Sequence, residues 1–176
     1  MRVALVIGHT RFSGGASSHN GVDEFEYNEE LAGMIASNLS DEHDIDALIF
    51  HRKSYRKLPK EINAKKPDIV ISLHCNAYNT QVSGSEVLYY YKSKNGKILA
   101  QKMLDAIKQA LDIKDRGVKG KSTEDRGGYI LRYTNAPCVI LEPFFIDNPD
   151  DYKIGKSMKN ELALSLSDAI LEYTNG

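Results

Sequence analysis

Residues 67–77 have the sequence PDIVISLHCNA, and residues 2–10 have the sequence RVALVIGHT. Each stretch is a short run of Val, Ile and Leu that ends in a histidine. Such uninterrupted apolar runs are typical of parallel strands that are buried on both faces. In open α/β sheets, ligands bind beyond the carboxyl ends of the strands. The two histidines, His9 and His74, therefore predict one shared site at that edge, and a metal is the ligand that a pair of imidazoles favours.

The rest of the chain alternates between apolar runs and helical patterns. The runs predict strands over 2–8, 44–50, 68–74, 85–91, 129–133 and 137–142. Apolar residues three to four positions apart predict helices over 23–38, 95–111 and 156–173. The basic stretch 52–66 predicts a solvated helix, and the charged, glycine-containing stretch 112–128 predicts a surface loop. Strands that alternate with helices indicate an α/β fold, a mostly parallel sheet with helices on both faces. We expect one domain over 1–176.

Composition narrows the possible functions. The 176 residues are 41% hydrophobic and 27% charged, which is ordinary for a globular domain. A formal net charge of −1 argues against nucleic acid and anionic membranes as partners. No apolar stretch approaches the about 20 residues of a spanning helix. The amino terminus predicts a first strand rather than a signal peptide, so we expect synthesis in the cytoplasm. Two cysteines, Cys75 and Cys138, predict buried free thiols.

Two acidic features could complete a metal site. A hydrolytic zinc site uses three protein ligands and keeps one position open for water. The cluster Asp23-Glu24-Phe25-Glu26 could supply the third ligand, and spacing alone does not separate Glu24 from Glu26. Glu142 follows the core residues of VILEPFF, where a carboxylate is expensive to bury unless it is paired or catalytic. A glutamate near such a site is the usual general base.

Four ordered motifs resemble those of the zinc-dependent N-acetylmuramoyl-L-alanine amidases of the amidase-3 type. They are Gly8-His9, E-x-x-x-N from Glu24 to Asn28, S-L-H-x-N-A from Ser72 to Ala77, and L-E-x-F-F-x-x-N from Leu141 to Asn148. The segment GSEVLYY at 84–90 also resembles the family strand that follows the second histidine. Pro143 and Cys75 depart from residues common in the family. The resemblance spans almost the whole chain.

The resemblance implies a six-stranded sheet with helices on both faces. It implies zinc held by His9, Glu24 and His74, with Glu142 as the catalytic residue. The substrate it implies is peptidoglycan, cleaved between N-acetylmuramic acid and the L-alanine of the stem peptide. Asn76, two residues beyond His74, is a candidate substrate contact. Arg132, like Arg116 and Arg126, is a candidate partner for stem-peptide carboxylates.

Three other functions remain open at this point. A zinc carboxypeptidase-like enzyme would typically carry a short H-x-x-E pair, but Phe12 stands where its glutamate would follow His9. A non-catalytic wall-binding module would not need Glu142. A cytoplasmic structural or interaction protein would carry the histidines by chance. A chain of this kind without a signal peptide further resembles a phage endolysin released through a holin-type lesion, and we expect a monomer.

Overall fold

The structure, a computed structural model, describes residues 1–43 and 45–175, apart from the side chains of 41–43 and 174–175. Its strands are β1 (Arg2–Ile7), β2 (Asp46–His51), β3 (Ile69–Leu73), β4 (Ser85–Tyr90), β5 (Asp115–Lys121) and β6 (Cys138–Glu142). Its helices are α1 (Glu24–His43), α2 (Leu58–Ala64), α3 (Lys94–Leu111), α4 (Gly128–Tyr133), α5 (Pro149–Ser157) and α6 (Lys159–Asn175).

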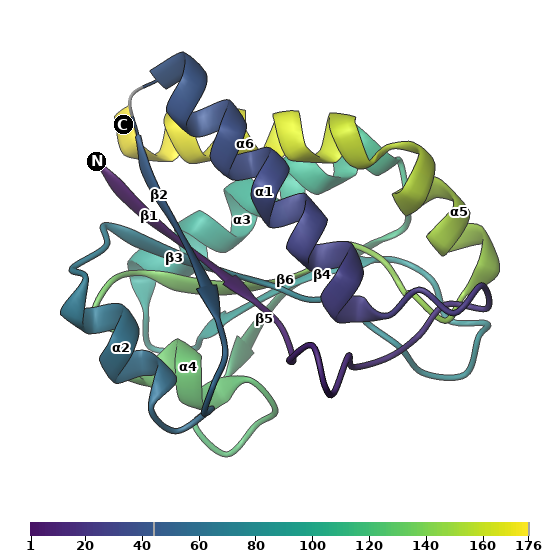
Figure 1. The fold of residues 1–176 in the computed structure, drawn as a ribbon, viewed down its shortest axis with the longest axis horizontal. Helices are drawn as coiled ribbons and strands as arrows, with labels where there is room; N and C mark the ends of the chain where they lie inside the picture. The colour runs from purple at the N-terminus through teal and green to yellow at the C-terminus, as the bar shows by residue number, and fades with distance from the viewer. Residues whose placement is uncertain (44, 176) are drawn as a thin grey trace.

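The strands form a six-stranded sheet in the order β2-β1-β3-β6-β4-β5 (Figure 1). Neighbouring strands β2, β1, β3 and β6 run parallel to one another. Strand β4 runs antiparallel to β6, and β5 runs parallel to β4. The predicted α/β class with a mostly parallel sheet is therefore confirmed, and the two reversed strands lie together at one edge.

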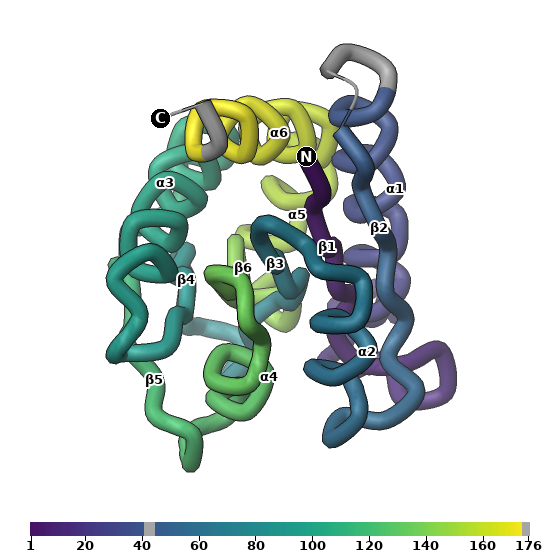
Figure 2. Tube along the Cα trace, turned by 90° about the vertical axis from the view of Figure 1, so that its left-hand side faces the viewer, coloured from purple at the N-terminus to yellow at the C-terminus, as the bar shows by residue number. Residues whose placement is uncertain are grey.

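Helices cover both faces of this sheet (Figure 2). One face packs against α1, α3 and α6 through alternate strand residues such as Leu5, Ile71 and Leu141. The other face packs against the short helices α2 and α4 through the intervening residues, such as Val6 and Val70. Strand residues that alternate between two buried faces explain why β1 and β3 are continuously apolar.

Three sequence predictions are wrong. The stretch 112–128 was expected to be a loop, but it contains the edge strand β5, whose sequence DRGVKGK is polar because an edge strand is half solvated. The stretch 129–133 was expected to be a strand, but it belongs to helix α4, which packs its Ile and Leu on the sheet. The helix expected over 156–173 is confirmed as α6, but its start is wrong: residues 156 and 157 end a separate, unexpected helix, α5, which begins at Pro149 behind the cap Asn148. Position 44 of the expected strand 44–50 lies outside the described residues.

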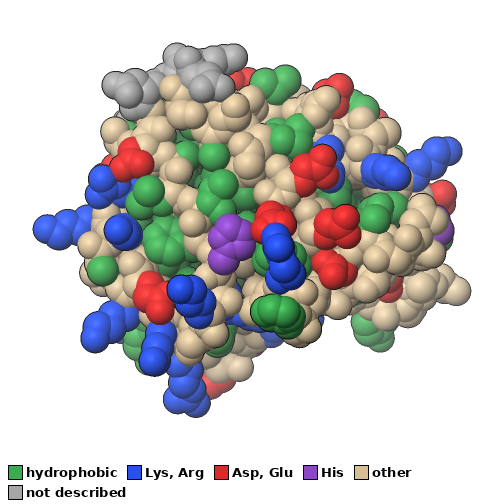
Figure 3. All heavy atoms as spheres, in the orientation of Figure 1, with side chains coloured by type: hydrophobic (Ala, Val, Ile, Leu, Met, Phe, Trp, Pro, Cys, Tyr) green, Lys and Arg blue, Asp and Glu red, His purple; other side chains and the backbone are tan. Residues whose placement is uncertain are grey.

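The register of the parallel strands brings the predicted site residues to one edge. Ile7 pairs with Leu73, and Leu73 pairs with Leu141, so the residues that follow these three strand positions are neighbours. His9, His74 and Glu142 follow at that edge. On the face seen in Figure 3, Lys and Arg side chains gather at the left and lower left with few acidic side chains among them, and the acidic side chains lie mainly nearer the centre and right. In the described part of the chain, none of the helices has the length and apolar character needed to cross a membrane.

Candidate active site

The structure brings His9, Glu24 and His74 together. One ligand atom from each lies within 4.8 Å of the others. Nε2 of His9 is 3.1 Å from Oε2 of Glu24, and Nδ1 of His74 is 2.8 Å from Oε1 of the same carboxylate. The carboxylate thus lies between two imidazoles from different strands, whose rings meet edge to face at 5.4 Å.

Glu24 reaches this position because it is the first residue of α1 and is nearly fully buried. Its carboxylate accepts hydrogen bonds from the backbone N–H groups of Cys75 and Ala16. Burial acts to raise the pKa of Glu24, but the hydrogen bond with His74 and the nearby imidazole of His9 hold that pKa well below its ordinary value. Glu26, the alternative that spacing left open, is exposed on the outer side of the helix.

Two glycines permit this close packing. A Cβ at Gly8 would lie 2.6 Å from the ring of His74, and a Cβ at Gly15 would lie 2.6 Å from Oε2 of Glu24. Gly15 also has a φ of +87°, which side chains rarely adopt. His9 itself has a φ of 63°, a left-handed conformation that is uncommon for residues other than glycine. The backbone around the cluster is therefore shaped to present these three side chains.

The three residues fit a divalent metal ion. In a tetrahedral zinc site with bonds of about 2.0–2.1 Å, ligand atoms lie about 3.3 Å apart, which is close to the measured separations. Nε2 of His9 is buried without a hydrogen bond, although it lies near Glu24. A buried imidazole nitrogen that has no hydrogen-bond partner is free to ligate a metal ion. Three ligands also leave one coordination position open for water.

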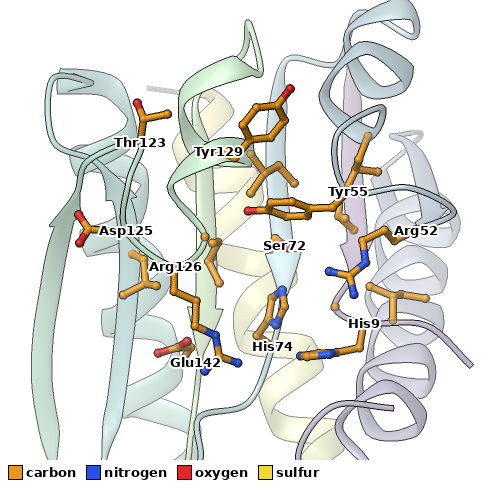
Figure 4. A pocket seen from close by; sticks show the side chains of 18 of the residues that line it. His9, Arg52, Tyr55, Ser72, His74, Thr123, Asp125, Arg126, Tyr129 and Glu142 are labelled. Carbon is orange, nitrogen blue, oxygen red and sulfur yellow. The ribbon is translucent and has the colours of Figure 1, made fainter. Parts of the chain in front are cut away.

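Glu142 ends β6 on the same edge and faces this cluster (Figure 4). Its Oε2 accepts a hydrogen bond of 2.9 Å from Nδ2 of Asn76. Its cross-strand partner in β4 is Glu86. Burial, together with a hydrogen bond to Glu86 and the negative charge of that residue, raises the pKa of Glu142 to about 8. The carboxyl group is thus set to hold a proton near neutral pH, which suits a general acid and base.

A cavity of about 350 Å³ opens beside the cluster, on the face of the sheet that α2 and α4 cover. Its floor is apolar and includes Val6, Leu88 and Ile140. In Figure 4, Arg126 extends toward Glu142 and Arg52 toward His9. The cavity therefore combines an apolar floor with two cationic groups at the reacting edge, which is the usual character of a ligand site.

The predicted substrate contacts have different environments. The side-chain nitrogen of Asn76 donates hydrogen bonds to Glu142 and, at 3.2 Å, to Glu86. Arg132 is exposed on α4, with its guanidinium group over the rings of Tyr90 and Tyr133, and it is not among the residues that line the cavity.

Sequence reasoning did not single out Glu86. Its motif, GSEVLYY, identified a strand, but its contact with Glu142 depends on the antiparallel pairing of β4 with β6. The aromatic wall formed by Tyr55 and Tyr129 was also missed, because these residues come from separate segments whose meeting has no local sequence signal.

A His–Glu–His cluster at the strand ends of an α/β sheet, with a second carboxylate at the end of a neighbouring strand, is the architecture of a metal-dependent hydrolase. Comparison with known proteins identifies the family. The family model of N-acetylmuramoyl-L-alanine amidases, of the amidase-3 type, matches residues 3–172. The chain belongs to this family, and the resemblance seen in its motifs is confirmed.

Individual relatives agree with this assignment. The chain is 26% identical to N-acetylmuramoyl-L-alanine amidase LytC of Bacillus subtilis in an alignment of 162 positions that covers 88% of this chain and 32% of LytC. It is 29% identical to the endolysin of Bacillus phage SPP1 in an alignment of 187 positions that covers 98% of this chain and 66% of the endolysin. The chain thus spans less than two thirds of the length of these relatives.

Solved structures share the fold. An N-acetylmuramoyl-L-alanine amidase from Clostridium difficile 630 superimposes with a TM-score of 0.90 at 24% identity, covering 99% of this chain and 97% of that one. The catalytic domain of the CD27L endolysin, which targets Clostridium difficile, superimposes with a TM-score of 0.81 at 29% identity, covering 98% and 97%.

Proposed function

We propose that this chain is a zinc-dependent peptidoglycan hydrolase that cleaves the amide bond between the lactyl group of N-acetylmuramic acid and the L-alanine of the stem peptide. The observation that carries the proposal is the buried carboxylate of Glu24 between His9 and His74, with Glu142 at the end of the strand next to that of His74. Membership of the amidase family supplies the substrate class.

His9, Glu24 and His74 would hold the metal. When bound there, zinc supplies Lewis acidity, which lowers the pKa of water to about 7 and polarises a carbonyl group. The low pKa of Glu24 keeps this residue ionised, and an anionic carboxylate between two imidazoles gives the set a strong preference for a cation. The glycines at 8 and 15 keep the three donors at this spacing.

Glu142 would move the proton. As water attacks the lactyl carbonyl, the carboxylate of Glu142 accepts the proton of the water, and the resulting carboxylic acid then protonates the departing nitrogen of L-alanine. A raised pKa favours both steps, since a carboxyl group that titrates near neutral pH can accept and release a proton under the same conditions. Asn76 would orient Glu142 through its 2.9 Å hydrogen bond and thus act on the substrate indirectly.

The cavity would receive the part of the substrate next to the scissile bond. Its apolar floor suits the methyl groups of the lactyl and alanyl units, and Arg126 and Arg52 are placed to meet a stem-peptide carboxylate. Arg132 would meet substrate only where a longer peptide or glycan extends over α4, because its side chain lies outside the cavity.

The site of action would be the cell wall. An endolysin is among the relatives. By analogy with it, we propose that the protein acts as a monomer after release through a holin-type lesion. Sedimentation of the purified protein tests the monomer, and co-expression with and without a holin tests the route.

Mass analysis of the products from a soluble muramyl peptide tests the reaction. We expect a free peptide that begins with L-alanine and an intact muramic acid, and we expect chelation to abolish their release. Loss of a carboxy-terminal amino acid instead would indicate a carboxypeptidase. Binding to peptidoglycan without any product would indicate a wall-binding module.

A further inference from the structure

Outside the metal cluster, a chain of hydrogen bonds leads from the sheet edge to Glu142. Arg116, in β5, donates from Nε to Oε2 of Glu86 at 2.8 Å. Oε1 of Glu86 accepts from Nδ2 of Asn76 at 3.2 Å, and the same nitrogen donates to Oε2 of Glu142 at 2.9 Å. Four side chains from β5, β4, the segment after β3, and β6 are thereby joined.

Each link of this chain is fixed by its own surroundings. Asn76 is held on both sides of its peptide, by a backbone hydrogen bond to Phe144 and another from Ile146. Its side-chain oxygen accepts from the N–H of Ala77 at 2.9 Å, so its amide nitrogen must face the two carboxylates. The amide therefore presents its nitrogen, and not its oxygen, to the two carboxylates.

The side chain of Arg116 is also held in place by its neighbours. Its guanidinium group lies 5.0 Å from the ring centre of the buried Phe145. Its aliphatic stem passes so close to Gly84 that a Cβ there would lie 2.7 Å from it. Packing on the ring of Phe145 and against Gly84 confines the side chain of Arg116 to one geometry. Its guanidinium group can therefore fix the position of the Glu86 carboxylate.

Glu86 and Glu142 are direct cross-strand partners, and their carboxyl groups repel each other whenever both are ionised. Arg116 and Asn76 are what hold them here. A general base must stay within about 0.5 Å of its productive position, which requires a supporting shell of this kind.

We propose that Glu86 and Arg116 are positioning residues for the amidase reaction, holding Glu142 through Asn76 in the orientation that proton transfer requires. This inference rests on the proposed function, because it takes Glu142 to be the base. Neither residue touches the metal cluster or lines the cavity.

Steady-state kinetics on a soluble muramyl peptide test the proposal, with the zinc-loaded wild type and four variants. Glu86→Ala and Arg116→Met should each lower kcat about tenfold or more, with KM within about twofold and zinc stoichiometry unchanged. The double variant should be no slower than Glu86→Ala alone, because the two residues act in series. Glu86→Gln should restore most of kcat, since it keeps the shape and an acceptor oxygen.

The matched control is Lys108→Gln. It removes a 2.9 Å ion pair between Lys108 and Asp115 of the same edge strand, β5, and should leave kcat unchanged. The proposal is overturned if Glu86→Ala keeps kcat within about twofold of wild type, if KM rises in step with the loss, or if the two substitutions are additive.

Crystal structures of zinc-loaded wild type and Glu86→Ala give a readout that does not depend on activity. We expect Glu142 to leave Asn76 in the variant; a Glu142 that stays in place contradicts the inference. An inactive wild type with a displaced Glu142 in the variant would refute the proposed function and leave the positioning role intact. An active Glu86→Ala variant with an unmoved Glu142 would refute the positioning role and leave the proposed function intact.

Discussion

Replacing Glu142 with glutamine should remove activity and, at alkaline pH, stabilise the metal-free protein. Glutamine keeps the size of the side chain and an oxygen that can accept the hydrogen bond from Asn76. It cannot accept the proton of water. General acid–base catalysis contributes about 10²–10⁴-fold, so kcat should fall by that factor, which raises the barrier by about 3–5 kcal/mol.

The stability effect follows from the raised pKa of the same group. In the folded protein the pKa of Glu142 is about 8, because of burial and Glu86, against an ordinary 4.5. Between these values the folded state binds a proton that the unfolded state does not, so wild-type stability falls as pH rises through this window. One pKa unit corresponds to about 1.4 kcal/mol, and since the pKa of the partner Glu86 is lowered and offsets part of the effect, we expect Glu142→Gln to gain about 1–3 kcal/mol at pH 8.5.

Guanidinium unfolding of chelator-treated protein at pH 5 and pH 8.5 measures this gain. The variant and the wild type should be about equally stable at pH 5, and the variant should be more stable at pH 8.5. Glu26→Gln, on the exposed side of α1, is the control and should show no such pH dependence. A stability difference that is the same at both pH values, or near-normal turnover by the zinc-loaded variant, would refute the reasoning.

Further predictions concern the metal cluster and its glycines. His9→Ala should weaken zinc affinity by about 100-fold or more, whereas His19→Ala, on an exposed loop, should bind one zinc as the wild type does; metal titration monitored by competition with a chelating dye distinguishes them. Gly15→Ala should destabilise the protein by about 1–2 kcal/mol from its positive φ and should also weaken zinc binding, because its Cβ would meet Glu24 at 2.6 Å. Gly33→Ala, in an open position of α1, should instead raise the free energy of unfolding by about 0.5–1 kcal/mol. Thermal unfolding with and without zinc measures both effects, and equal behaviour of the two variants would contradict both expectations.

The sequence was sufficient to predict the features that depend on local pattern. Buried parallel strands have a continuous apolar signature, so β1, β3 and β6 were located from their residues alone. The rule that ligands meet the carboxyl ends of such strands was sufficient to group His9 with His74. The choice of Glu24 over Glu26 came from family resemblance, because both positions open the same helix and only tertiary packing buries one of them.

Other features depend on packing that no short stretch encodes. The polar sequence of β5 resembles a loop because its partner is β4 on one side and solvent on the other. Glu86 lies opposite Glu142 because β4 runs antiparallel to β6. The sequence of a strand does not indicate whether it pairs in a parallel or an antiparallel direction. The sequence signal for α5 was present in Asn148-Pro149, a cap followed by proline, and it was overlooked.

The most direct test of the central claim is the zinc content of the purified protein measured together with the mass of the products it releases from a muramyl peptide. The account predicts one zinc per chain, lost in His74→Ala, and a peptide whose new amino terminus is L-alanine. A protein that releases this peptide at full rate after its metal has been removed, or a zinc-loaded protein that cuts a different bond, would contradict it.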